Sequence, residues 1–393
     1  MTTAQAGASV VQQALGSLSP TFVATFGLTK AQLGVIFTAL MLGSALFVGV
    51  AGLLTDRWGE RHVMLWSGAL MAGALLAASL VQAYPWLVGC IFVFGAAYAA
   101  STPAGGRAVL AWFDRDRGFA MGIRQTGVPV GGLIGALTLP LFAHAFGYRV
   151  AFVFAAVIVI VTTLIAILGY REAPDDGGPQ TSSAAIVRGM RVLARDPRLI
   201  GVTATCMILV SVQLAMNAFV TVTGVSIVGT SAAVAAIAFA CAQGAAACGR
   251  LSWGYISDRV LGGERLVPFA IICVLAAAAT ATLAFLQPGS VVLLFAAAIV
   301  LGLSGAGWNG LMAAALAEVG GVERAASALG IALTAIFLAS SIAPTAFGSL
   351  ADHTSLRVAW LTIAALALVG VVPVLWLRAH LNAPARRSTT RSG

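Results

Sequence analysis

The sequence predicts an all-α polytopic membrane protein, with twelve transmembrane helices arranged in two pseudo-symmetric bundles of six. Composition, the length of the apolar runs and repeated motifs support this prediction. Of 393 residues, 60% are hydrophobic and only 9% are charged, and the mean hydropathy is +0.98. Soluble domains carry about a quarter charged residues. Lipid must therefore be the solvent for most of this surface, and in lipid each backbone amide needs a partner inside its own segment.

The apolar runs are about twice as long as the roughly ten-residue strands of a membrane β-barrel, so they predict helices. Charged residues, Gly and Pro mark the boundaries between them. The first run is the weakest, because Gln12, Gln13 and Pro20 interrupt it, and we expect the chain to begin inside this helix. The predicted helices cover residues 7–27, 31–54, 63–83, 85–112, 118–146, 149–170, 199–224, 230–256, 266–286, 290–316, 325–349 and 357–378.

One long polar segment divides the chain. Residues 171–198 begin with a stretch rich in Pro, Gly, Asp and Ser, which is typical of a linker. We therefore predict an N-terminal six-helix bundle over 1–170, a cytoplasmic linker over 171–198, a C-terminal six-helix bundle over 199–380 and a cytoplasmic tail over 381–393.

The net charge of +9 does not indicate a nucleic-acid partner, because the cations lie in the short gaps between apolar runs. With the N-terminus inside the cell, sixteen of the 22 Lys and Arg residues are cytoplasmic and three are on the opposite side. This asymmetry places both termini in the cytoplasm. High Arg and Ala content with a single Lys is typical of a GC-rich bacterium, so we expect the protein in the inner (cytoplasmic) membrane. We also expect it to be a monomer in the lipid bilayer.

Short motifs recur between the two halves at nearly constant offset. Gly52-Leu-Leu-Thr-Asp56-Arg57 recurs 202 residues later as Gly254-Tyr-Ile-Ser-Asp258-Arg259, and Arg149-Val-Ala-Phe recurs 208 residues later as Arg357-Val-Ala-Trp. These matches indicate an internal duplication. Duplicated membrane halves place a solute site at their interface near the middle of the bilayer, and the two halves rock around it.

The loop between the second and third predicted helices carries the spacing G-x-x-x-D-R-x-G-x-R, formed by Gly52, Asp56, Arg57, Gly59 and Arg61. At this loop, and in helix number and duplication, essentially the whole chain resembles the major facilitator superfamily. The resemblance implies transport of a small solute by alternating access. We predict that the loop is a latch, in which the glycines permit a tight turn and the charged residues pair across the cytoplasmic interface.

The second copy of the loop, with Asp258 and Arg259, has two extra residues before Gly263, so its geometry is less well defined. Upstream, Gly249-Arg250 resembles a run found in the eighth helix of many members of that family. Arg250 lies about two turns before Asp258. We expect these two residues to form a structural ion pair near the cytoplasmic surface, in preference to a solute contact.

Arginines inside the apolar runs indicate function, because a charge in hydrocarbon is costly and faces a cavity or a partner. Arg124 lies on the same helical face as Gly131, and we expect this face to look toward the other half. The repeat partners of Arg124 and Gln125 are Ala332 and Leu333, so the polarity belongs to one half only. We predict a solute contact for both polar residues; an ion pair or snorkelling to the cytoplasm is the alternative for Arg124.

The glycines of the fifth predicted helix form a stripe. Gly127, Gly131 and Gly135 recur at intervals of four and predict close helix packing. With Pro129, they loosely resemble a glycine-proline run of antiporters in the same family.

Arg107, on the fourth predicted helix, shares a face with Asp114, so solute binding and pairing with Asp114 or Asp56 remain equal alternatives. Two inward-facing guanidinium groups would suit a carboxylate or another oxyanion and would repel cations. The other candidate solute contacts are uncharged, and each could instead bond a neighbouring helix. They are Gln13, Thr102, Gln213, Asn217, Trp308 and Asn309.

All thirteen Asp and Glu residues fall at helix ends or in loops. Proton relays in transporters commonly use an acid inside the membrane. The sequence therefore favours exchange or facilitated movement of an anion, or cotransport in which the solute carries the proton.

Two other classes are alternatives. An exporter of hydrophobic or neutral compounds, of the drug or sugar efflux type, would fit the glycine-proline run. A membrane enzyme should show an HExxH motif, a Ser/His dyad or paired acids within helices, and the sequence shows none of these. The five cysteines form no CxxC pair. We expect neither an enzyme nor a bound cofactor or metal.

Overall fold

The computed structural model describes residues 2–101, 105, 117–170 and 195–382. Every described element is a helix, and ten helical segments are long and apolar enough to cross a membrane. The first span is a broken helix formed by α1 (Thr2–Ala14), η1 (Leu15–Leu18) and α2 (Ser19–Phe26), and the fourth is α4 (Tyr84–Tyr98). The arrangement is consistent with twelve spans and confirms an all-α polytopic membrane fold.

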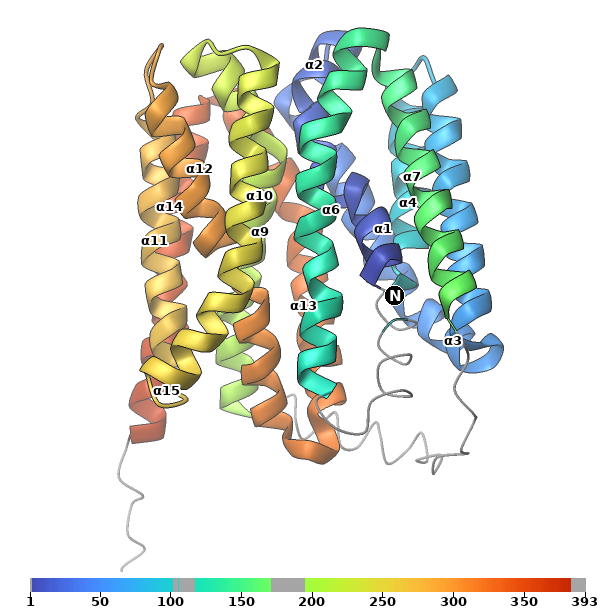
Figure 1. Ribbon diagram of the computed structural model, residues 1–393. Helices are drawn as coiled ribbons and strands as arrows, with labels where there is room; N and C mark the ends of the chain where they lie inside the picture. Colours follow the sequence, from blue (N-terminus) through green and yellow to red (C-terminus); the bar gives the residue numbers. More distant parts are fainter. Residues whose placement is uncertain (1, 102–104, 106–116, 171–194, 383–393) are drawn as a thin grey trace, which may run out of the picture.

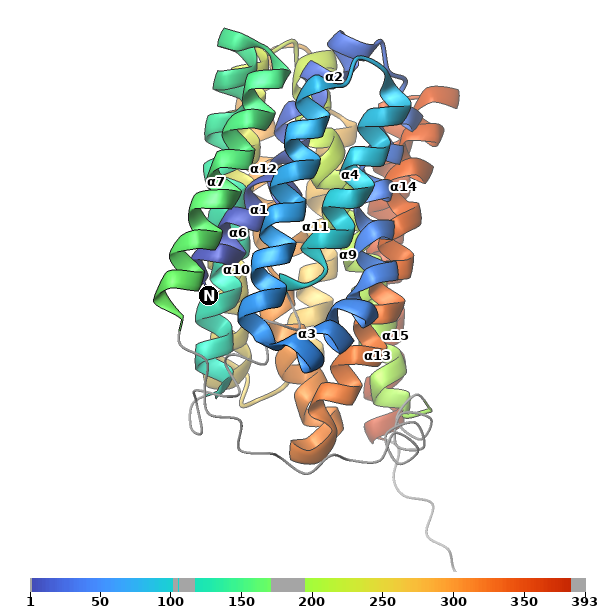
Figure 2. The same ribbon diagram turned by 90° about the vertical axis from the view of Figure 1, so that its right-hand side faces the viewer.

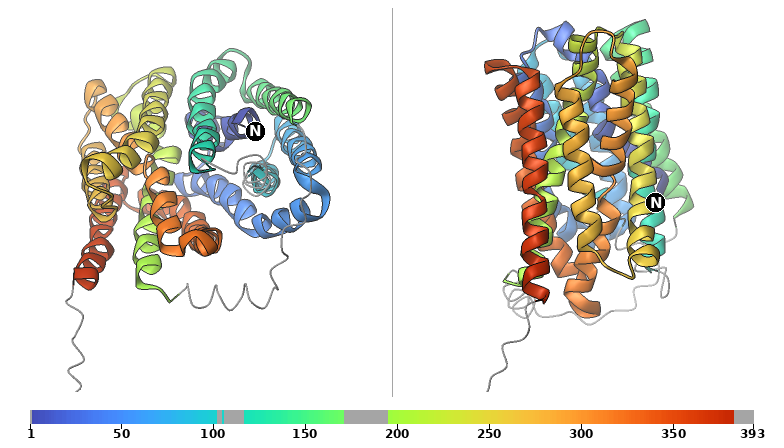
Figure 3. Two further views of the ribbon diagram at one scale, coloured as in Figure 1. Left: turned by 60° about the horizontal axis from the view of Figure 1, so that its bottom comes forward. Right: turned by 90° about the vertical axis from the view of Figure 1, so that its left-hand side faces the viewer.

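The helices form two bundles that stand side by side (Figures 1 and 3). The first bundle also contains α3 (Lys30–Leu80), α6 (Arg117–Phe146) and α7 (Tyr148–Gly169). The second contains α9 (Pro197–Thr223), η2 (Gly224–Val228), α10 (Ala232–Tyr255), η3 (Ile256–Val260), α11 (Leu266–Ala284), α12 (Val291–Gly305), α13 (Asn309–His353), α14 (Leu356–Val369) and α15 (Val371–Asn382). We call these bundles the N-half and the C-half.

Two of the long helices, α3 and α13, each contain parts of two spans. In α3 the spans Lys30–Thr55 and Arg57–Leu80 meet near Gly59, which has φ 78° and ψ 162°. Such a positive φ costs a glycine little, so the predicted tight turn is confirmed at this residue. The N-terminus of α3 carries a capping box, in which the Thr29 side chain accepts from Gln32 N and the Gln32 side chain accepts from Thr29 N.

The two ends of the molecule differ in how the halves meet. We call the end where α7 stops at Gly169 and α9 starts at Pro197 the linker end; it lies at the bottom of Figure 1. The opposite end is the far end. The largest apolar cluster includes Phe152 of the N-half and Phe219 of the C-half, whereas a second cluster, around Trp308, belongs to the C-half alone.

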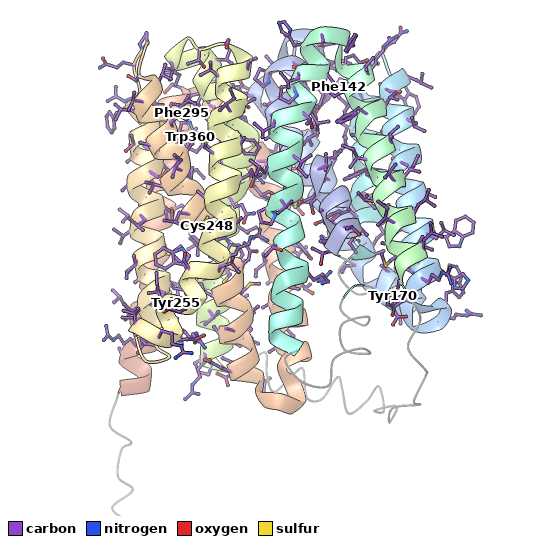
Figure 4. All side chains as sticks on the ribbon, viewed as in Figure 1. Phe142, Tyr170, Cys248, Tyr255, Phe295 and Trp360 are labelled. Atoms are coloured by element: carbon purple, nitrogen blue, oxygen red, sulfur yellow. The ribbon has the colours of Figure 1, made fainter. Side chains whose placement is uncertain are left out.

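The outer surface of the bundles is apolar. Leu80, Leu168 and Val292 are 77%, 80% and 82% exposed. Side chains project outward along the whole height of the helices in Figure 4. In water this surface would be an association site, but in a bilayer it lies against lipid tails. The chain is therefore a multi-pass membrane protein.

At the far end, Asp352 of α13 caps the N-terminus of α3 across the two halves. Its carboxylate accepts from the backbone N–H groups of Lys30, at 3.0 Å, and Ala31, at 2.7 Å. The Lys30 ammonium lies 3.5 Å from the same carboxylate. A carboxylate at a helix N-terminus satisfies orphan amides and favours the helix dipole. We call these contacts the Asp352 clamp (Figure 2 shows α3 and α13 from the side).

We expect Asp352→Asn to lower the thermal unfolding midpoint in detergent slightly, by the equivalent of about 1 kcal/mol or less, because the clamp is exposed to solvent. Lys30→Gln removes only the longer ion-pair contact and leaves both main-chain bonds, so its effect should be smaller. An equal or larger shift for Lys30→Gln would show that the main-chain bonds to Asp352 contribute little.

Candidate functional site

Arg124 is buried inside the N-half. Its side chain, on α6, is 4% exposed. Nη1 donates to Gln5 Oε1 at 3.0 Å and to the main-chain oxygen of Ser101 at 3.1 Å. The guanidinium group therefore connects the fifth span to the first and the fourth, and it does not turn outward to lipid headgroups.

The glycine face of α6 looks toward α1 of the same half, so the prediction that it looks toward the other half is wrong. A Cβ added at Gly127, Gly131 or Gly135 would lie 2.7, 2.1 or 2.4 Å from main-chain oxygens of α1. Close packing along the stripe is thus confirmed. Because Arg124 shares this face, its side chain meets Gln5 of α1 rather than a residue of the C-half.

A small cavity of about 20 Å³ lies beside Arg124. A polar site of this size has room for one water molecule. Its wall is formed by N-half residues from the first, third, fourth, fifth and sixth spans. They are Ala4, Gln5, Met64, Ser67, Met71, Ser101, Gly105, Arg124 and Thr163. The guanidinium group is therefore next to a space that a hydrogen-bonding molecule can enter.

Tyr98, at the end of α4, extends this polar site toward the C-half. Its hydroxyl oxygen accepts from Gln5 Nε2 at 3.1 Å and lies 3.5 Å from Ser9 Oγ. The positive charges of Arg124 and Arg250 both contribute to the electrostatic environment of Tyr98, and Arg250 belongs to α10 of the C-half. We call Gln5, Ser9, Tyr98, Arg124 and Arg250 the polar centre.

A second polar group joins the halves nearer the far end. Asn217 Nδ2, on α9, donates to Gln13 Oε1 at 3.0 Å, and Gln243 Nε2, on α10, donates to the main-chain oxygen of Gln13 at 3.3 Å. All three side chains are buried. Asn217 Oδ1 has no hydrogen-bond partner within the described ranges. The sequence predicted Gln13 and Asn217 as solute contacts, and the structure brings them together, with Gln13 and Gln243 both next to Gly132 of α6.

The remaining predicted contacts are not gathered at one place. Gln213 is buried in α9. Trp308 lies in the C-half apolar cluster and donates to Gly305 O, and Asn309 donates to Ala306 O within the same chain segment. Thr102, Arg107 and the side chain of Gln125 lie outside the described residues. For all six, a solute contact stays a prediction.

The latch residues surround the turn at the linker end of α3. Gly52 is helical and faces open space, and Arg57 and Arg61 are exposed. The side chain of Asp56 lies outside the described part of the chain. Pairing across the halves at this loop stays a prediction.

In the second copy of the loop, Asp258 forms its ion pair with Arg265 at 2.5 Å, whereas Arg250 lies in the polar centre. This differs from the expected pair of Asp258 with Arg250. Arg265 also meets Glu318 of α13 at 2.6 Å. The Glu318 hydrogen bond, with help from Asp258, raises the pKa of Arg265 above its ordinary value. Arg259 is exposed.

Comparison with known proteins identifies the family. The Major Facilitator Superfamily model matches residues 1–293. An MFS-type transporter of Mycobacterium tuberculosis is 35% identical over 353 residues, which cover 86% of this chain and 76% of that protein. The chain belongs to the Major Facilitator Superfamily. Its fold and family make it a membrane transporter of small solutes.

Two more distant likenesses bear on this MFS transporter. A probable sulfoacetate transporter of Cupriavidus necator is 27% identical over 150 residues, which cover 38% of this chain and 35% of that protein. The solved structure of a bacterial homologue of the human lysosomal transporter Spinster, in an inward-facing and occupied conformation, aligns with a TM-score of 0.80 at 16% identity. It covers 96% of this chain and 95% of that one. At this identity the likeness shows the MFS fold.

Sequence reasoning missed four polar residues of these two groups: Gln5, Ser9 and Tyr98 of the polar centre, and Gln243 beside Gln13. A polar side chain in an apolar run usually bonds a neighbouring helix, so none of the four stood out. The available signal was helical spacing, because Gln5, Ser9 and Gln13 recur every four residues on the first span and so share one face.

Proposed function

We propose that this MFS transporter carries a small organic or inorganic anion, of the carboxylate type, by exchange or cotransport. The observation that carries the proposal is the buried Arg124 guanidinium beside a small polar cavity. Arginine stays protonated at any physiological pH, and its planar fork matches a carboxylate. A solute carboxylate that reached this cavity would add a charge-assisted bond to those that Arg124 makes with the Gln5 and Ser101 oxygens.

The second cation of the polar centre supports an anion. Arg250, from the C-half, and Arg124, from the N-half, both contribute positive potential at Tyr98. An anion bound between them would favour the two halves closing around it, whereas a cationic solute would be repelled by both. The relative from Cupriavidus necator, a probable transporter of the anion sulfoacetate, is consistent with this chemistry.

We further propose the bacterial inner membrane as the location, with both termini in the cytoplasm, because sixteen of the 22 Lys and Arg residues fall in the sequence segments predicted for one side of the membrane. The bundles would then correspond to residues 1–170 and 199–380, joined by the cytoplasmic segment 171–198. All thirteen Asp and Glu residues fall at predicted helix ends or in loops, which favours transport without an intramembrane proton relay. Any transported proton would then be bound to the solute itself.

The experiment is uptake into proteoliposomes, with radiolabelled small carboxylates, sulfonates, sugars and quaternary ammonium compounds compared under an imposed pH gradient. We expect saturable uptake of one or more anions and none of the cations. Ligand-induced shifts of the unfolding midpoint should select the same anions, because a ligand stabilises the state it binds. Accumulation of a permanently uncharged solute driven by the gradient would refute the proposal.

A further inference from the structure

The first span contains a break in its α-helical hydrogen bonding. Between α1 and α2, residues Leu15–Leu18 form a 3₁₀ segment, and Pro20 stands in the first turn of α2. In an α-helix the carbonyl of Gly16 would accept from the N–H of residue 20, but proline has none. The Ser19 N–H donates to this carbonyl instead, and the second lone pair of the oxygen, which lipid cannot satisfy, is open to another donor.

Side chains of the C-half donate hydrogen bonds to main-chain oxygens at this break. Thr221 Oγ1, on α9, donates to Gly16 O at 2.6 Å, and Gln243 Nε2 donates to Gln13 O at 3.3 Å. Thr221 is 1% exposed and Gln243 is 2% exposed. Two main-chain carbonyls of the N-half are thus capped by buried side chains of the other half.

The backbones touch at the same point. A Cβ added to Gly16 would lie 1.4 Å from the main-chain oxygen of Asn217, closer than for any other glycine within the described ranges. Only glycine permits this approach. The absence of a side chain at Gly16 therefore brings its carbonyl within reach of Thr221, one turn along α9 from Asn217.

Other threonines of α9 do not behave in this way. Thr205 Oγ1 and Thr223 Oγ1 donate to carbonyls of their own helix, Gly201 and Phe219, at 3.1 and 2.8 Å. This is the ordinary position of a threonine hydroxyl inside a helix. Thr221 instead gives its proton to the broken segment of the N-half.

We propose that Thr221 and Gln243 are positioning residues for alternating access: they hold the far end closed by donating, from the C-half, to main-chain carbonyls at the break in the first span. When the halves part at the far end, Gly16 O and Gln13 O lose these donors, and entering water must replace them. The proposal rests on alternating access by this family but not on the nature of the solute, so it can fail or hold independently of anion transport.

The test compares Thr221→Val, which keeps the shape and removes the donor, with two matched variants of the full chain. Thr221→Ser keeps the hydroxyl. Thr205→Val makes the same change at another threonine of α9, whose hydroxyl donates within the C-half. Nitroxide labels at Gln82→Cys and Gln287→Cys, two exposed positions in far-end loops, report the separation of the halves. The five native cysteines are replaced first.

Double electron–electron resonance without added solute should show a longer-distance population for Thr221→Val, with the ratio of open to closed raised about 2- to 10-fold. The Thr221→Ser and Thr205→Val distributions should match that of the parent. Gln243→Leu should shift the ratio in the same direction as Thr221→Val. If Thr221→Val and Gln243→Leu both keep the parent distribution, with unfolding midpoints like that of Thr205→Val, the capping bonds do not control closure and the proposal is overturned.

Discussion

Arg124→Gln should raise the apparent KM for anion uptake by about 30-fold or more. Removing one partner of a buried, hydrogen-bonded charge pair costs about 2–5 kcal/mol, and 2 kcal/mol corresponds to about 30-fold. Glutamine keeps a polar group of moderate length near Gln5, so the first, fourth and fifth spans should remain joined. Initial rates of uptake against solute concentration, together with the unfolding midpoint in detergent, measure both effects.

The control for Arg124→Gln is Arg149→Gln, which removes an exposed cation at the start of α7 and should leave the apparent KM unchanged. Gly105→Ala gives a second variant that retains the charge. Its Cβ would lie 2.5 Å from Arg124 Nη1, so the guanidinium must move. We expect an intermediate rise in KM. A normal KM in both Arg124→Gln and Gly105→Ala would place the solute elsewhere.

Gly348→Leu should abolish transport while leaving the protein folded in the membrane. A Cβ at Gly348 would lie 2.1 Å from Lys30 O, where α13 of the C-half crosses the start of α3. Overpacking a tight contact costs about 1–3 kcal/mol, and here the strain falls only on the closed far end. The halves should relieve it by staying apart. Uptake and the far-end label distances measure the result.

The matched control is Gly89→Leu on α4, because nothing lies within 4 Å of a Cβ at that position. It should transport normally. Loss of protein from the membrane in Gly348→Leu but not in Gly89→Leu would mean that this crossing is needed for folding rather than for closure.

Helix positions were predictable where charges border the apolar runs. The predicted helix 149–170 corresponds to Tyr148–Gly169, and 199–224 corresponds to Pro197–Thr223, because Arg residues and the polar linker bracket both. The first helix was harder. Its interruption by Gln13 and Pro20 was visible, but the 3₁₀ segment there and the hydrogen bonds that it accepts from the other half were not.

The candidate site was predictable in part. A charge in an apolar run is rare, so Arg124 was found, but the direction of its helix face depends on which neighbour approaches the glycines. Periodicity defines a face without naming the neighbour. Tyr98 and Gln243 were missed for the same reason, because their partners come from helices far away in sequence.

The Asp352 clamp and the contact at Gly16 differ in their access to water. Opening the clamp exposes two amide groups at a surface where solvent replaces the carboxylate at once, while Thr29 continues to cap the same helix. Its release should therefore be fast and nearly neutral in free energy. The carbonyl of Gly16 is buried and gains a substitute donor only after the helices separate. The buried contact at Gly16, and not the Asp352 clamp, should determine the activation barrier for opening and hence the temperature dependence of turnover.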